Sequence, residues 1–145
     1  MQLVPYSEFG RLRLRPFCPD DELYDEDVDE HGDFIKEEIR GVWFARWRKR
    51  PDELFVITVH LDDCSTDVAP LLFPKIRLKL EAGITPDEAE LRFECAPESQ
   101  TDGREIMDFR TSGQWPYIVH CSFGDESRLR SVSVRRLDIE IPDDE

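Results

Sequence analysis

Alternation of apolar and polar residues is the feature that most constrains the fold of this chain. A period of two places alternate side chains on opposite faces of a β-strand. Five segments show it, and residues 54–61 form an additional run rich in β-branched and apolar residues. The alternating segments are 11–15, 75–80, 89–95, 117–123 and a last one over about 128–141. This spacing predicts a mainly β domain, an antiparallel β-sandwich or flattened barrel of about seven or eight strands.

Residues 34–48 fit both a helix and a strand. Their large apolar residues lie at helical spacing, but Gly41 would weaken a helix by about 1 kcal/mol relative to Ala. The aromatic and β-branched residues of 40–48, followed closely by the strand at 54–61, favour a strand with Trp43, Ala45 and Trp47 on one face. We therefore expect at most one short helix in the chain.

The last alternating segment changes parity. Val132 and Val134 are even-numbered, whereas Leu137 and Ile139 are odd-numbered. A strand changes parity only through an extra residue or a break, so we predict a bulge or bend near residues 135–136. Residues 142–145 are expected to be a frayed tail.

The length of 145 residues, 39% of them hydrophobic, suits a single β domain over 1–145. The four cysteines, Cys18, Cys64, Cys95 and Cys121, form no C-x-x-C pair, which indicates structural thiols and a cytoplasmic location. Cys95 and Cys121 fall within alternating segments and are expected to point inward. No apolar run is long enough to span a membrane, and no signal peptide is recognisable.

The charge is concentrated in one segment. The net charge is −14, which argues against nucleic acid and anionic membranes as partners. Residues 20–38 hold eleven carboxylates and one lysine, so they contribute −10 of the −14. We expect residues 18–38 to form a long acidic loop inserted in the β domain.

This acidic loop suggests a docking surface for a basic protein partner, because dense carboxylates steer a cationic target electrostatically. Trp43 or Trp47 would add an apolar anchor. The chain would then be a non-catalytic interaction protein of the inhibitor or immunity-protein type. The steering residues are Asp25, Asp27, Asp29, Glu30 and Asp33.

A calcium site is the first alternative. Residues 27–38 resemble an EF-hand loop, with Asp27 and Asp29 at the first and third positions, Gly32 at the sixth and Glu38 at the twelfth. His31 stands at the fifth position, where calcium prefers an oxygen ligand. No other cofactor is indicated by the sequence.

An enzyme or small-ligand binding module within the β domain is the second alternative. The sequence lacks a glycine-rich phosphate loop and a G-x-S-x-G motif. His120 and Ser122 share one face of a predicted strand, but the sequence supplies no acid to orient the histidine. A non-catalytic role is therefore favoured, and no catalytic residue is assigned.

Overall fold

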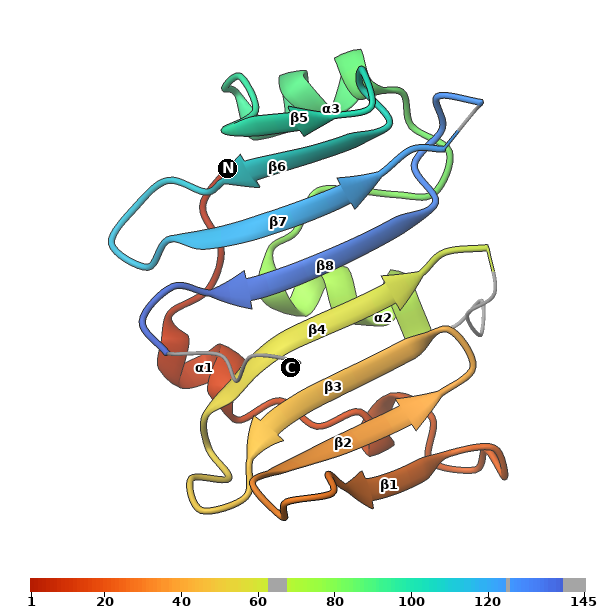
Figure 1. Cartoon of the computed structure of the whole chain (residues 1–145), viewed down its shortest axis with the longest axis vertical. Coiled ribbons are helices and arrows are strands. Elements are labelled where there is room, and N and C mark those ends of the chain that lie inside the picture. Colours follow the sequence, from red (N-terminus) through yellow and green to blue (C-terminus); the bar gives the residue numbers. More distant parts are fainter. Residues whose placement is uncertain (63–67, 125, 140–145) are drawn as a thin grey trace.

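The strands of this protein lie in one sheet. The computed structural model describes residues 1–62, 68–124 and 126–139. Within these residues, eight strands pair antiparallel in the order β1-β2-β3-β4-β8-β7-β6-β5 (Figure 1). They are β1 (Asp25–Val28), β2 (Phe34–Ile39), β3 (Val42–Trp47), β4 (Leu54–His60), β5 (Ser99–Thr101), β6 (Ile106–Arg110), β7 (Tyr117–Ser122) and β8 (Ser131–Arg136).

The strand order consists of two meanders. Strands β1 to β4 follow one another along the chain, as do β5 to β8, and each neighbour pairs with the next. The two meanders meet where residues 56–60 of β4 pair with residues 131–135 of β8. Gly41, with φ of 72°, permits the tight reversal between β2 and β3.

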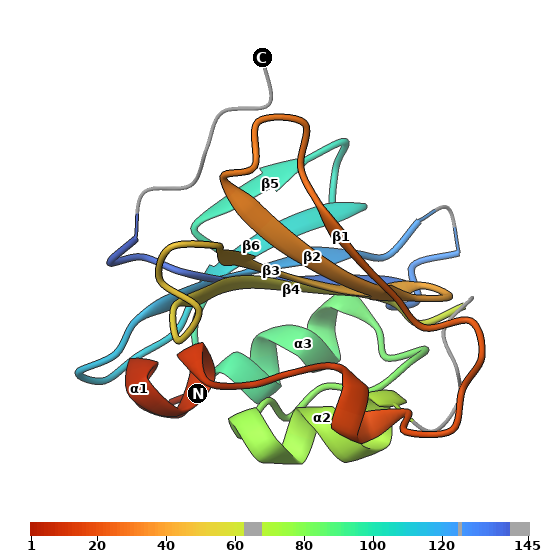
Figure 2. The ribbon, with the colours of Figure 1, turned by 90° about the horizontal axis from the view of Figure 1, so that it is seen from below.

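The helices lie together on one face of the sheet, and no described helix lies on the other face (Figure 2). They are α1 (Tyr6–Gly10), the short 3-10 helix η1 (Arg15–Phe17), α2 (Val68–Ile76) and α3 (Pro86–Phe93). Fully buried aromatic rings from both layers fill the space between them, and Phe93 of α3 stacks on Phe109 of β6 at 4.2 Å between ring centroids. None of these helices is long and apolar enough to cross a membrane.

The mainly β, antiparallel class is therefore confirmed, with eight strands in the described residues, but the predicted sandwich or barrel is not. The sheet does not close into a barrel, and in the described residues no second sheet faces it. Three α-helices, where at most one was expected, supply the second layer instead. A single sheet with one covered face still buries the alternating inward residues, which is why the sequence pattern resembled that of a sandwich.

Three of the segments in which alternation predicted a strand form no strand in the structure. Residues 89–95 belong largely to α3, whose buried residues Pro86, Ala89 and Phe93 follow helical spacing. Residues 75–80 begin in the last turn of α2 and continue as an unpaired segment, and residues 11–15 lead into η1. Cys95 is consequently exposed, contrary to expectation, whereas Cys121 is buried as predicted.

The expected acidic loop over 18–38 is instead largely a hairpin, because β1 and β2 pair within it. The preferred strand over 40–48 is confirmed by β3, and the run at 54–61 by β4. The predicted break near residues 135–136 is also confirmed, since β8 ends at Arg136 and a bend follows. The expected frayed tail at 142–145 and Cys64 lie outside the described residues.

Candidate functional site

The uncovered face of the sheet carries a continuous row of cross-strand partners. Residues paired directly across antiparallel strands share one face and lie about 5 Å apart at Cβ. One such row crosses all eight strands and begins with carboxylates at the β1 edge. In spatial order it contains Asp25, Glu38, Trp43, Thr58, Ser133, His120, Asp108 and Ser99.

The acidic hairpin, residues 25–38, forms one edge of this face. Asp25, Asp27, Glu30 and Asp33 are exposed there. Because β1 pairs with β2 through Asp25↔Glu38 and Asp27↔Lys36, the carboxylates of Asp25 and Asp27 lie on the uncovered face. The structure therefore gathers four of the five predicted steering residues at one exposed edge.

Asp29, the fifth, has a structural role in the turn. Its carboxylate accepts hydrogen bonds from the backbone N–H of Phe34 (2.9 Å) and of His31 (3.3 Å). Desolvation opposes its ionisation, but backbone N–H groups of Phe34, Asp33 and His31 outweigh this effect and hold the pKa of Asp29 below its usual range. Asp29 thus shapes the turn that presents Glu30 and Asp33.

An aromatic patch adjoins the acidic hairpin on the same face. It comprises Phe34, Trp43, Trp47 and Phe55. The Phe55 ring lies 6.2 Å from that of Phe34 and 5.5 Å from that of Trp47, measured between centroids. The ammonium of Lys36 lies 4.9 Å from the centroid of Trp43. Both tryptophans are partly buried, so each keeps some ring surface available for contact.

A buried ion pair fixes the hairpin to the covered face. The side chains of Glu37 and Arg46 are 2% and 8% exposed, and Arg46 Nη1 donates to Glu37 Oε1 at 2.6 Å. Glu37 Oε2 also accepts from the Tyr24 hydroxyl (2.8 Å) and the backbone N–H of Leu14 (3.0 Å). Burial, and then the adjacent Glu37 carboxylate, raise the pKa of Tyr24, which keeps this donor protonated.

The candidate calcium ligands are not brought together. Residues 27–38 form a hairpin in which Asp27 faces Lys36, Glu38 faces Asp25, and Asp29 is engaged in the turn. In the described part of the chain, no three His, Cys, Asp or Glu side chains are grouped so that they could hold a metal ion. The helix that an EF-hand would need after the loop is replaced by β2 and β3.

At the opposite end of the row, His120 has an acidic partner that sequence reasoning missed. Its Nδ1 lies 2.6 Å from Asp108 Oδ1, and Ser99 Oγ donates to Asp108 Oδ2 at 2.9 Å. Asp108 escaped attention because β6 was not predicted, so nothing in the sequence pattern placed this acid beside His120. A small cavity of about 240 Å³ opens here, lined by Asp108, Ile118, His120, Ser133 and Arg135.

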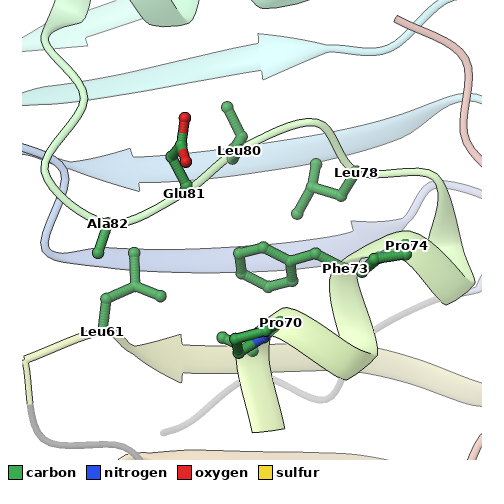
Figure 3. Close-up of a pocket in the computed structure, with 9 residues that line it drawn as sticks. Leu61, Pro70, Phe73, Pro74, Leu78, Leu80, Glu81 and Ala82 are labelled. Carbon is green, nitrogen blue, oxygen red and sulfur yellow. The ribbon is translucent and has the colours of Figure 1, made fainter. Parts of the chain in front are cut away.

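A second, apolar pocket lies on the helical side of the sheet (Figure 3). It has a volume of about 400 Å³ and is lined mainly by Leu61, Pro70, Phe73, Leu78 and Leu80. The Glu81 carboxylate at its border is 2.9 Å from Arg92 Nη2. The pocket therefore offers mostly apolar contact. Most of its walls are formed by α2 and by the segment that follows α2.

Comparisons with protein-family models, with curated proteins and with solved structures find no match to this chain. The functional argument consequently rests on the site itself.

Proposed function

We propose that this chain is a non-catalytic interaction protein that docks a basic surface of a protein partner through the acidic hairpin, in the manner of an inhibitor or immunity protein. The observation that carries this proposal is the position of the exposed carboxylates beside the aromatic patch on one uncovered face. Carboxylates speed encounter with a cationic partner, and a neighbouring tryptophan can supply the central apolar contact.

The edge position of β1 also supports docking. β1 is the terminal strand of the sheet, with a neighbour on one side only among the described residues. Such an edge can accept an extended segment of another chain through backbone hydrogen bonds. Pairing with β1 of a second copy would bring Asp25, Glu26 and Asp27 against like charges, so a basic partner suits this edge better.

Of the two predicted anchors, Trp43 fits the role better. It lies in the same cross-strand row as Asp25 and Glu38. Trp47 packs against Phe55, and its indole Nε1 is buried without a hydrogen-bond partner in the described residues. Trp47 therefore supports the patch, whereas Trp43 combines proximity to the acidic edge with partial exposure.

The test compares two variants that remove four charges each. One neutralises the hairpin by Asp25→Asn, Asp27→Asn, Glu30→Gln and Asp33→Asn. The control neutralises exposed carboxylates outside the hairpin, by Glu88→Gln, Glu94→Gln, Asp102→Asn and Glu126→Gln. A partner captured by wild-type protein at low salt is purified, and its association rate is then measured with each variant over a salt series.

We expect the hairpin variant to lose about tenfold or more in association rate and most of its salt dependence. The control variant should stay close to wild type, and Trp43→Ala should mainly speed dissociation. Equal effects of the two charge variants would refute a specific role for the hairpin. Unchanged dissociation from Trp43→Ala would remove Trp43 as the anchor.

A further inference from the structure

The cavity beside His120 lies where the row of side-chain hydrogen bonds is interrupted. On one side, Ser99 donates to Asp108, which pairs with His120 Nδ1. On the other side, the hydroxyls of Ser133 and Thr58 are 3.1 Å apart. His120 and Ser133 are direct cross-strand partners, yet in the described residues no hydrogen bond joins their side chains. The interruption coincides with the cavity of about 240 Å³.

Arg135 supplies a positive charge to this cavity. It lies two residues after Ser133 on β8 and therefore on the same face, and its direct cross-strand partners there are Val56 and Ile118, both apolar. The side chain is exposed, and among the described residues no carboxylate lies within ion-pair distance of it.

The carboxylate of Asp108, which also lines this cavity, is engaged by two hydrogen-bonding partners. One of its oxygens is engaged by His120 and the other by Ser99. The nearby Arg110 is likewise engaged, because its guanidinium pairs with Glu98 at 2.8 Å. The contact of His120 Nδ1 with Asp108 leaves Nε2 as the ring nitrogen that can meet a ligand, as a donor in the imidazolium or as an acceptor from a protonated phosphate oxygen in the neutral ring. Arg135 is the cationic side chain in the cavity lining.

Three groups that can hydrogen-bond a phosphate line one small cavity: a guanidinium, an imidazole nitrogen and a hydroxyl. A carboxylate is already satisfied by a single guanidinium in a two-point contact, whereas a phosphate has further oxygens for the imidazole and the hydroxyl. The volume equals that of about eight waters at roughly 30 Å³ each, which leaves room for a phosphate group and part of the molecule that carries it. We propose that the cavity lined by His120, Ser133 and Arg135 binds the phosphate group of a small molecule.

The experiment uses inorganic phosphate as the probe and the whole chain in phosphate-free buffer. The imidazole nitrogens of His120 are followed by long-range ¹H–¹⁵N spectra, with His120→Gln identifying its signals among the three histidines. Titration calorimetry measures the affinity in parallel, and acetate is titrated as a second arm. We expect phosphate to shift the His120 signals with a dissociation constant below about 10 mM and to bind more tightly than acetate.

Arg135→Gln should weaken phosphate binding by about tenfold or more, and Ser133→Ala by a smaller factor. Arg40→Gln is the matched control, since Arg40 is an exposed arginine in the β2–β3 turn and its loss changes the net charge equally. Arg135→Lys should bind phosphate with intermediate affinity, because it keeps the positive charge but loses the planar guanidinium that can donate two parallel hydrogen bonds. Melting temperatures of these surface variants check that each one folds.

Several results would overturn the proposal. One is the absence of a His120 shift at about 10 mM phosphate. Another is equal weakening by Arg135→Gln and Arg40→Gln, which would indicate a general charge effect. Acetate binding as tightly as phosphate would refute the stated ligand class. The site is independent of partner docking, so the four-charge hairpin variant should bind phosphate at least as well as wild type.

Discussion

The buried Glu37–Arg46 pair gives the most sharply defined prediction. The Glu37 carboxylate accepts four hydrogen bonds, from Arg46, Tyr24 and the backbone N–H groups of Leu14 and Arg15. Arg46→Met removes the only buried cation that contacts it in the described residues. Leaving a buried charge without its partner costs about 3–5 kcal/mol, a large share of the 5–15 kcal/mol typical of a domain.

Glu37→Gln alone should also destabilise the protein, since it leaves the Arg46 guanidinium buried. Only Glu26, 3.6 Å away and about half exposed, then remains as a partner, and such a contact contributes about 0–1 kcal/mol. The double variant Glu37→Gln/Arg46→Met leaves neither of these two buried charges, and the Gln carbonyl can still accept from Tyr24 and Leu14. We therefore expect the double variant to be more stable than either single variant.

Urea unfolding followed by circular dichroism measures the cycle. A loss of about 4 kcal/mol lowers the midpoint by roughly 2 M at a slope of about 2 kcal/mol/M. The exposed, two-point pair of Arg110 and Glu98 is the internal control, and its coupling should be below about 1 kcal/mol. If the two single losses at Glu37 and Arg46 simply add in the double variant, the reasoning from buried charge is wrong.

Three further predictions concern single elements of the fold. Thr85→Ala removes the side chain that caps α3 by accepting from Glu88 N–H at 3.2 Å, and it should cost about 1 kcal/mol in the urea assay. In thiol labelling of the native protein, exposed Cys95 should react quickly, whereas Cys121 should react only on unfolding; fast labelling of Cys121 would contradict its burial. Burial raises the pKa of both the Cys121 thiol and the Tyr117 hydroxyl, so the native state holds these protons where the unfolded state releases them. Their effect on the free energy of unfolding should be constant below about pH 8, where the unfolded thiol is still protonated, and destabilising as the pH rises further, which a series of melts across this range can check.

The sequence predicted burial better than it predicted hydrogen-bonded partners. In residues 76–80 the expected alternation is present, with Ile76, Leu78 and Leu80 buried and Arg77 and Lys79 exposed. The segment is nevertheless no strand, because a period of two describes an extended chain lying on a core and does not require a neighbouring strand. The central strands β3, β4 and β7 were predicted because these segments are rich in β-branched and aromatic side chains.

The error at α3 had a recognisable signal. Thr85, Pro86 and Glu88 match a helix start, with a cap, a proline in the first turn and an acid three residues after the cap. The alternation in residues 89–95, with Leu91, Phe93 and Cys95 at every second position, predicted a strand there instead. Leu91 is in fact 77% exposed. Because Cys95 is exposed as well, two of these three residues imitated a period of two without sharing a buried face, and they concealed the helical spacing.

The candidate site could be predicted only in part. The acidic residues and the two tryptophans were found because charge and aromatic content are visible in composition. Strand register decides whether Asp25 and Trp43 share a row and whether His120 pairs with Asp108. A shift of one residue in the register would place these side chains on opposite faces of the sheet. Register is set by pairing between distant segments, so these juxtapositions required the structure.

The meeting of the two meanders at β4 and β8 has a consequence for the folding pathway. Every other strand pairing joins consecutive strands and closes a short loop, whereas β4–β8 joins segments separated by both α2 and α3. Closing that long loop costs the most chain entropy, so this central contact should form late, after the rate-limiting barrier to folding. The outer hairpins can form earlier, since they need only local contacts. Thr58 and Ser133 face each other across this junction, and substitutions there should affect the unfolding rate more than those in the β2–β3 turn.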